Sequence, residues 1–297
     1  MIRVVNLSPA IDVTYQLPRL LPGNALRVEK VLRVPGGKGV NVARVIHAGN
    51  KEVKLVLPLG GSSGKWIADQ LNEIGIEIEA VAIGAETRTC VAVVAEEVTV
   101  LNEPAAQISE AEFSELIGLL EEEVDVSVLS GSLPSNLDSP SLDKLFSTLR
   151  QSSKIFIVDT SGKALVQACS HSPDLIKPNK DELLAATSET DLQIAAQSLL
   201  AKGTKAVLVS DGDAVARLIR KDAALSAVPK KVIGNPTGAG DAMVALAAIS
   251  MLEGKSDREL LAAAVAAGAL AVEKEVAGEI DWSQLAQLAA SIEVREN

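Results

Sequence analysis

The 297-residue chain carries 28 Lys and Arg residues against 39 Asp and Glu, which gives a formal net charge of -11. Nucleic acids and anionic membranes are bound through clustered basic residues, so this charge argues against both kinds of partner. Only 2% of the residues are aromatic, which excludes a surface of base-stacking rings, and two cysteines, Cys90 and Cys169, are too few for a disulfide framework. No signal-peptide pattern opens the chain and the longest apolar stretch, 242–252, is too short to cross a bilayer, so we expect a cytoplasmic protein.

Short β-rich segments alternate with segments of helical period along most of the chain. The expected strands lie at 2–7, 53–60, 126–131, 154–161, 174–179 and 205–212, and the expected helices at 39–50, 65–75, 110–124, 142–152, 191–203 and 242–254. This alternation predicts an α/β fold with a doubly wound, mostly parallel sheet. Ligands of such sheets bind beyond the carboxyl ends of the strands.

Two stretches, 13–34 and 88–101, alternate apolar and polar residues without a helical period. They are expected to form strands of a separate small sheet, a β lid. The predicted organisation is therefore an α/β core of residues 1–12, 35–87 and 102–297, with a lid of residues 13–34 and 88–101.

The stretch GNPTGAGDAMVAL, residues 234–246, places a lone acid, Asp241, after a Gly-rich loop and before an apolar helix. Free N–H groups at a helix N-terminus attract anions, and glycines let a phosphate approach the backbone closely. Asp241 could simply cap the helix, which stabilises it by about 1 kcal/mol. Alternatively, it could be a general base that takes a proton from a hydroxyl attacking a phosphoryl group held by the loop. The loop alone favours capping.

Two further stretches carry candidate ligand-binding residues. In VPGGKGVNVAR, 34–44, Lys38 and Asn41 could face a ligand, although the glycines could equally form a plain turn. In IKPNKDE, 176–182, Asn179 and Glu182 have the spacing of a capping box, and spacing alone favours that structural interpretation.

Taken in order, SPAID, GGKGVNVA, ETRTC, SGSLP, PNKDE, VSDGD and NPTGAGDA resemble the PfkB family of ribokinase-like carbohydrate kinases over essentially the whole chain. GGKGVNVAR together with TRTC and NEP is most similar to the phosphosugar branch, which includes fructose-1-phosphate, tagatose-6-phosphate and minor 6-phosphofructokinases. The resemblance implies a ribokinase-like doubly wound sheet with a small β-sheet lid.

The resemblance also implies roles for individual residues. Asp241 matches the catalytic base, and the backbone of Gly238, Ala239 and Gly240 matches an anion hole. The positions that bind sugar hydroxyls are Asp12, Gly37 and Asn41, and those that hold the substrate's existing phosphate are Arg27, Lys38, Arg88 and Ser130. ATP and Mg²⁺ are expected at Lys177, Asn179, Glu182, Ser210 and Gly212, with Glu182 reaching the metal through water.

The function implied is ATP-dependent phosphorylation of a ketohexose phosphate, with fructose 1-phosphate converted to fructose 1,6-bisphosphate. Alternatives are a tagatose-6-phosphate or fructose-6-phosphate kinase, a kinase of an unphosphorylated sugar or nucleoside, and a non-catalytic regulator that binds a sugar phosphate. Val215, where the family usually has glycine, and an altered segment at 267–285 depart from the pattern on the nucleotide side, so no adenine contact is assigned there. A homodimer formed through the lid is expected.

Overall fold

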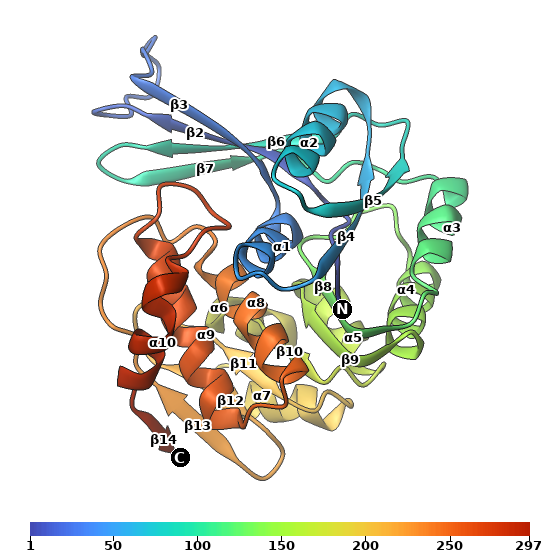
Figure 1. The fold of residues 1–297 in the computed structure, drawn as a ribbon, viewed down its shortest axis with the longest axis vertical. Helices are drawn as coiled ribbons and strands as arrows, with labels where there is room; N and C mark the ends of the chain where they lie inside the picture. The colour runs from blue at the N-terminus through green and yellow to red at the C-terminus, as the bar shows by residue number, and fades with distance from the viewer.

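A ten-stranded, mostly parallel sheet runs through the computed structural model, which describes residues 1–297 (Figure 1). In spatial order its strands are β14 (Val294–Glu296), β13 (Ala224–Ala227), β12 (Ala216–Ile219), β11 (Val207–Val209), β10 (Leu175–Ile176), β9 (Ser153–Asp159), β8 (Val124–Ser130), β1 (Ile2–Val5), β4 (Val53–Leu59) and β5 (Glu77–Ala82). The strands from β11 to β5 are parallel, and β12, β13 and β14 extend the sheet in antiparallel fashion. The predicted doubly wound sheet is confirmed.

Helices cover both faces of this sheet (Figure 1). One face packs against α1 (Lys38–Ala48), α2 (Gly61–Glu73), α8 (Ala239–Leu252), α9 (Asp257–Val272) and α10 (Trp282–Ser291). The other packs against α3 (Glu110–Leu119), α4 (Ser139–Gln151), α5 (Gly162–Cys169), α6 (Lys180–Thr187) and α7 (Leu192–Ala201). α8 is buried along most of its length, which is why its sequence is apolar all round rather than on one stripe. No helix combines the length and apolar character needed to cross a membrane.

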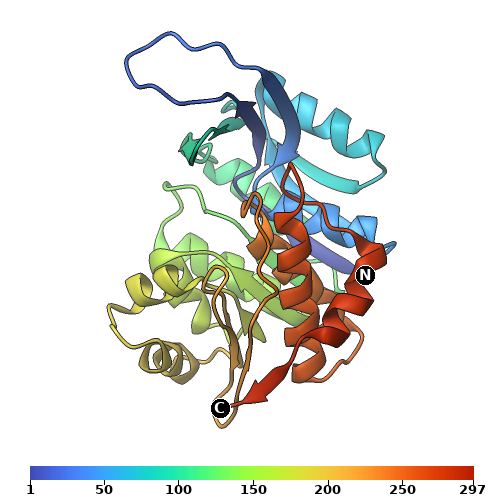
Figure 2. The same cartoon turned by 90° about the vertical axis from the view of Figure 1, so that its left-hand side faces the viewer.

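A four-stranded sheet lies over one end of the large sheet and forms the lid (Figure 2). Its strands are β3 (Lys30–Gly36), β2 (Ala10–Gln16), β6 (Arg88–Val94) and β7 (Val98–Asn102), and the central pair β2 and β6 is parallel while the outer pairs are antiparallel. Residues 17–29, expected to be strand, form an exposed loop instead. Pro18 and Pro22 cannot donate to a strand ladder, and Gly23 adopts a φ of 80°, so the chain turns there. The division of the chain into core and lid domains at the predicted residues stays a prediction.

The carboxyl ends of the parallel strands lie beneath the lid. β8 ends at Ser130 and β9 at Asp159, while Lys177 follows β10 and Ser210 follows β11. The N-terminal ends of α1 and α8 point to the same region, because Lys38 and Asp241 both face one cavity there. The fold therefore gathers polar side chains from distant parts of the sequence at the edge of the sheet that binds ligands in this fold class.

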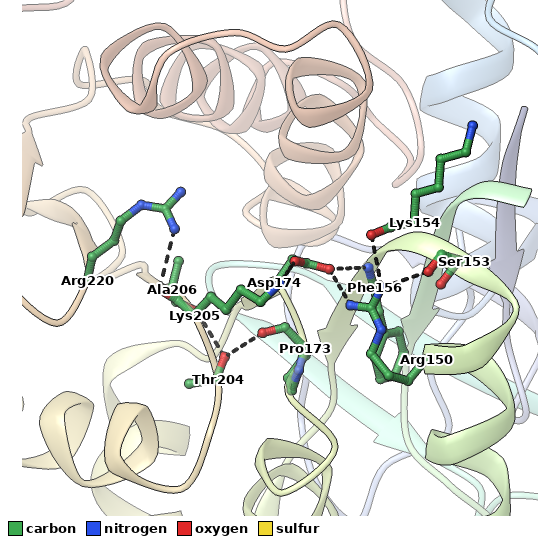
Figure 3. A network of polar contacts seen from close by, with 10 residues as sticks. All are labelled: Arg150, Ser153, Lys154, Phe156, Pro173, Asp174, Thr204, Lys205, Ala206 and Arg220. Carbon is green, nitrogen blue, oxygen red and sulfur yellow. Dashed lines mark hydrogen bonds and ion pairs between the residues drawn. The ribbon is translucent and has the colours of Figure 1, made fainter.

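A polar network fixes the opposite, amino-terminal edge of β10 and β11 (Figure 3). The carboxylate of Asp174 accepts hydrogen bonds from Arg150 Nη1 at 2.5 Å, Lys205 Nζ at 2.7 Å and the Phe156 N–H at 2.8 Å. Burial acts to raise the pKa of Asp174, but the bonds from Lys205, Phe156 and Arg150 outweigh it and leave the pKa below its usual value. One carboxylate thus ties three consecutive strands together.

We expect Asp174→Asn to lower the free energy of unfolding by about 2 kcal/mol at pH 7, since charge-assisted hydrogen bonds to a half-buried group are lost. A carboxylate with a lowered pKa stabilises the fold above its unfolded-state pKa, so the deficit should shrink as the pH falls below about 4. Urea unfolding of both proteins at several pH values measures this difference in the free energy of unfolding. Asp125→Asn is the control, because its ion pair with Lys154 is solvent-exposed and screened by water, so its loss should lower the free energy of unfolding by less than Asp174→Asn does.

Candidate active site

A cavity of about 800 Å³ lies between the lid and the carboxyl ends of the strands. Most of the residues singled out in the sequence line it, namely Asp12, Gly37, Lys38, Asn41, Arg88, Lys177, Asn179, Glu182, Ser210, Gly212, Gly238, Ala239, Gly240 and Asp241. The cavity is large enough for a small-molecule substrate together with a cofactor-sized ligand.

Asp241 is a buried carboxylate in the first turn of α8. The helix cap is Gly238, with no side-chain capping bond, so the interpretation of Asp241 as the capping residue is wrong. Its Oδ2 instead accepts a hydrogen bond of 2.8 Å from Nδ2 of Asn41 on α1. Burial, and then the nearby Asp159 charge, raise the pKa of Asp241 to about 6 against the opposing effects of Lys38, Asn41 and Lys177. The carboxyl is therefore a stronger base than an ordinary aspartate and is still mostly ionised at pH 7.

The loop before Asp241 offers backbone donors to the cavity. Gly238 has a φ of 85°, which a residue with a Cβ rarely adopts, and this conformation starts the helix. The Ala239 N–H donates to the Pro236 carbonyl at 3.2 Å, whereas the N–H groups of Gly238, Gly240 and Asp241 donate to no backbone carbonyl. Of the three residues expected to form an anion hole, the loop therefore leaves Gly238 and Gly240 open and adds the N–H of Asp241 itself.

Lys177 adds a positive charge to this loop. Its side chain is almost completely buried after β10, and its Nζ lies 3.0 Å from the point where a Cβ on Gly240 would stand. The glycine at 240 thus makes room for an ammonium group as well as for a ligand. Open N–H groups, a helix N-terminus and a cation at one point form a binding site for an anion.

Lys38 lies between two carboxylates on the same side of the cavity. Its Nζ is 3.3 Å from Asp159 Oδ1 and 3.5 Å from Glu182 Oε1. Glu182 and Asn179 form the predicted capping box, with the Asn179 N–H donating to Glu182 at 2.9 Å and the Glu182 N–H to Asn179 at 2.7 Å. The cap leaves the other carboxylate oxygen of Glu182 facing the cavity, so the structural and functional interpretations of this motif are compatible.

The lid supplies the other wall of the cavity. One row of neighbouring residues runs across the four strands of the small sheet. All four of its residues line the cavity, namely Val34, Asp12, Cys90 and Asn102. Burial raises the pKa of Asp12 to about 6, although the Gly37 N–H and the charges of Arg88 and Arg44 oppose the rise. A carboxylate and an amide side chain on the same wall, Asp12 and Asn102, offer acceptors and donors suited to the hydroxyl groups of a sugar.

Arg88 is held by backbone carbonyls rather than by an acid. Nη1 donates to Glu103 O at 2.8 Å and Nη2 to Ser8 O at 3.2 Å, while its buried Nε has no partner. An unpartnered buried donor of a guanidinium beside a polar cavity suits an anionic ligand group.

Two of the expected site residues do not line the cavity. Arg27 is exposed in the loop 17–29, which extends beyond the lid (Figure 2). Ser130 is buried behind the wall and its hydroxyl donates to Asp159 at 3.1 Å. Within one chain, neither residue therefore lines the cavity, and their contacts with the substrate's phosphate stay a prediction.

The end of the cavity where the family resemblance implies the nucleotide is lined by small and apolar residues. They include Val232, Val265, Gly268, Ala269 and Val272, and they come partly from the altered segment for which no contact was assigned. The run of Gly and Ala residues in the sequence of α9 was the signal that could have indicated this part of the cavity, because small side chains leave room for a flat ligand. Val215 does not line the cavity, whereas Gly212 and Asp213 do.

One segment after α9 touches the lid, α1 and the loop of Asp241. The Glu275 carboxylate pairs with Lys30 of the lid at 2.8 Å, and the Ala277 carbonyl accepts a bond of 2.7 Å from Arg44 of α1. A Cβ on Gly238 would stand 2.6 Å from the Cβ of Ala277, so the segment also packs directly on the anion-binding loop. Sequence reasoning missed Glu275, Ala277 and Arg44, whose contacts join residues more than 200 positions apart.

Two carboxyls in this cavity share a raised pKa of about 6, Asp241 and Asp12. If both must be ionised, log(kcat/KM) should fall below pH 6 with a slope approaching two, because two protons then inactivate the free enzyme. A pH profile between pH 5 and 9 measures the slope. In Asp12→Asn the remaining log(kcat/KM) should fall with a slope of one on the acid side. An unchanged slope of two would show that Asp12 is not one of the two groups that must be ionised.

Comparisons with known proteins agree with this geometry. The family model for pfkB family carbohydrate kinases matches residues 3–284. Phosphofructokinase-2 from Escherichia coli, solved in complex with fructose-6-phosphate, is 29% identical and superposes with a TM-score of 0.89 over 97% of this chain and 98% of that chain. A possible 1-phosphofructokinase from Thermotoga maritima has a TM-score of 0.90 at 20% identity, covering 100% of this chain and 99% of that one. Ribokinase from Arabidopsis thaliana, solved with ribose and ATP, has a TM-score of 0.76 at 21% identity over 97% and 98% of the chains, which shows that the fold is ribokinase-like.

Proposed function

Because the chain belongs to the PfkB family of carbohydrate kinases, and is thus an ATP-dependent sugar kinase, we propose that it phosphorylates a ketohexose phosphate. The proposed reaction converts fructose 1-phosphate to fructose 1,6-bisphosphate. The observation that carries the proposal is the placement of a buried base, Asp241, beside open backbone donors and the ammonium of Lys177.

In this proposal Asp241 takes the proton of the sugar hydroxyl. The hydroxyl oxygen then forms a bond to the terminal phosphorus of ATP, and the bond from that phosphorus to the leaving ADP oxygen breaks. The N–H groups of Gly238, Gly240 and Asp241, with Lys177, stabilise the charge on the phosphoryl group as it moves. The lid covers the reactants and excludes water, which would otherwise compete as acceptor.

A magnesium ion fits the nucleotide phosphates rather than a cage of protein ligands. No group of three or more His, Cys, Asp or Glu side chains in the chain could hold a metal ion. Mg²⁺ keeps several waters and is commonly bound by one carboxylate plus substrate phosphates, and Glu182 offers such an oxygen to the cavity. When bound, the metal supplies charge neutralisation for the phosphates.

The sugar end favours a substrate that already carries a phosphate. Arg88 lines the cavity there and its guanidinium bonds only to backbone carbonyls, so an uncharged sugar would leave it without an anion. Fructose 6-phosphate is the second candidate, since the 29%-identical phosphofructokinase-2 was solved with it. Both fructose phosphates would give the same product.

The test is ADP release with Mg-ATP on fructose 1-phosphate, fructose 6-phosphate, tagatose 6-phosphate, fructose and ribose. The proposal expects the highest kcat/KM on a fructose phosphate. Higher kcat/KM on fructose or ribose would replace it with the unphosphorylated-sugar alternative, and calorimetric binding of a sugar phosphate without any ADP release would replace it with the regulatory one.

We also propose a homodimer formed through the lid. Large apolar side chains are exposed on the lid and its loop, including Leu20, Leu21, Leu26, Val31, Val98, Val100 and Leu101. A cluster of this kind is typical of a protein interface. Light scattering should give twice the monomer mass, and Leu101→Lys should lower it; a monomer in the unmutated protein would contradict the proposal.

A further inference from the structure

Asp159 is a fully buried carboxylate at the carboxyl end of β9. Oδ1 lies 3.3 Å from Lys38 Nζ, and Oδ2 accepts the hydroxyl bond of Ser130 at 3.1 Å. Both oxygens are therefore occupied by protein groups, and the side chain has no surface that a ligand could touch. Asp159 can act on the reaction only through its neighbours.

Lys38 is the neighbour that reaches the cavity. Its ammonium lies between Asp159 and Glu182, and Asp159 is the main cause that raises the pKa of Lys38 above its usual value; Glu182 and Asp241 contribute further. Lys38 forms no salt bridge with Asp12, the acid of the lid wall. The pairs with Asp159 and Glu182 place the ammonium at the carboxyl ends of the strands rather than at the lid wall that carries Arg88.

We propose that Asp159 is a positioning residue that holds the ammonium of Lys38 at the point of phosphoryl transfer. Lys38 then stabilises the negative charge of the phosphoryl group during its transfer, instead of binding the phosphate that the sugar already carries. The inference rests on the proposed kinase function and assigns to Lys38 a role different from the one the family resemblance implied.

Three carboxylates surround this one ammonium, and their identities explain why a buried partner is needed. A closer approach of Lys38 to Asp241 would weaken the base further, and a closer pair with Glu182 than the observed 3.5 Å would compete with the cation that accompanies ATP. Asp159 touches no ligand, so it can hold Lys38 without weakening the base and without competing with the cation. The remaining N–H bonds of the ammonium are then free to point at an anion in the cavity.

Kinetics of Lys38→Met and Asp159→Asn test the assignment. Each should lower kcat by about 10- to 100-fold, while the KM for the sugar phosphate changes by less than about 3-fold, because the lost interaction is made in the transition state. A higher sugar-phosphate KM with unchanged kcat in Lys38→Met would overturn the proposal. Lys221→Met and Asp222→Asn are the matched controls: they make the same changes at exposed positions and should leave kcat within about 3-fold of the unmutated enzyme.

The double variant shows whether Asp159 acts through Lys38. Lys38→Met with Asp159→Asn should be no slower than Lys38→Met alone, whereas multiplied losses would mean that the two residues act independently and would overturn the proposal. The double variant removes the buried charge together with its partner, so it keeps the comparison possible even if Asp159→Asn alone does not fold.

The pH dependence gives a readout that a purely structural role would not move. The charged groups that act on Asp241 are Asp159 from β9, Lys38 from α1 and Lys177 after β10. Removing the Asp159 charge should shift the acid limb of kcat/KM to lower pH, and removing the Lys38 charge should shift it to higher pH. Shifts in the same direction would overturn the proposal.

Labelling of the ligand-free protein separates this inference from the proposed function. At pH 9 acetic anhydride should modify Lys38 more slowly than the exposed Lys221, because the ion pairs with Asp159 and Glu182 hold the Nζ of Lys38 against the protein wall, and Asp159→Asn should raise the rate of modification. Unchanged labelling in Asp159→Asn would overturn the pairing. If labelling responds as expected but the protein phosphorylates no sugar phosphate, the proposed function fails and the pairing stands.

Discussion

Asp241→Asn is expected to lower kcat by about 100- to 10,000-fold, the range that a positioned general base contributes. The side chain is buried, accepts a 2.8 Å bond from Asn41, and has a pKa raised to about 6, so it is poised to accept a proton near neutral pH. An amide of the same shape cannot take that proton. KM values for ATP and sugar phosphate should change little, because the anion-binding loop and the lid are left in place.

The same variant is expected to be more stable than the unmutated protein. A carboxyl whose pKa is raised by burial destabilises the folded state when it is ionised, so an uncharged amide should raise the free energy of unfolding at pH 7 by about 1 to 3 kcal/mol. Thermal unfolding measures this effect, and Asp222→Asn, at an exposed position, is the control for both measurements. Loss of activity accompanied by a lower melting temperature would indicate damage to the fold and would contradict the role of base.

Arg88→Met is expected to lower kcat/KM for the preferred fructose phosphate by about 10- to 100-fold, mainly through KM. The physical reason is the loss of a charge-assisted bond from the guanidinium, whose buried Nε has no partner within the protein. The measurement is a comparison of two substrates. Activity on fructose, however low, should be affected far less than activity on the phosphosugar, because fructose carries no anion for Arg88.

Arg88 also supports the carbonyls of Glu103 and Ser8, so a general loosening of the lid must be distinguished from a lost ligand contact. Arg88→Lys retains a positive charge and should recover part of the phosphosugar activity. Equal losses on fructose and on fructose phosphate in Arg88→Met would assign the residue to the structure of the lid alone.

The parallel part of the sheet and most of the cavity wall could be predicted from sequence because each signal is local. Strands such as 154–161 end in polar residues and are followed by helical patterns, and the order of these units sets the topology. Strands at both ends of the sheet were missed, namely the parallel edge strand β5 and the antiparallel strands β12, β13 and β14. The last three have three or four residues each with few β-branched side chains, which gives too weak a signal. Whether Asp241 caps α8 was also not decidable locally, because the left-handed Gly238 sets the start of the helix.

Contacts between distant residues could not be predicted in the same way. Lys38 and Asp159 are 121 positions apart, and nothing in the stretch VDTS indicates that its acid becomes fully buried beside a lysine. Arg27 illustrates the same limit, since its place in the family pattern implies a phosphate contact, whereas within one chain it lies in an exposed loop and does not line the cavity, so that contact stays a prediction.

The segment from Glu275 to Ala277 connects the lid to the loop proposed to hold the transferred phosphoryl group, and this connection affects how fast water hydrolyses ATP. Its ion pair with Lys30 is exposed and worth less than about 1 kcal/mol, so the lid can open at little cost, but the same segment also packs on Gly238 beside the phosphoryl-binding loop. If the lid lifts to admit a sugar, this segment loses its ion pair with Lys30, and the segment is the neighbour that packs on Gly238. We therefore expect ATP hydrolysis by water to be slow while the lid is open, because the groups that stabilise transfer are brought into register only when the acceptor has been enclosed.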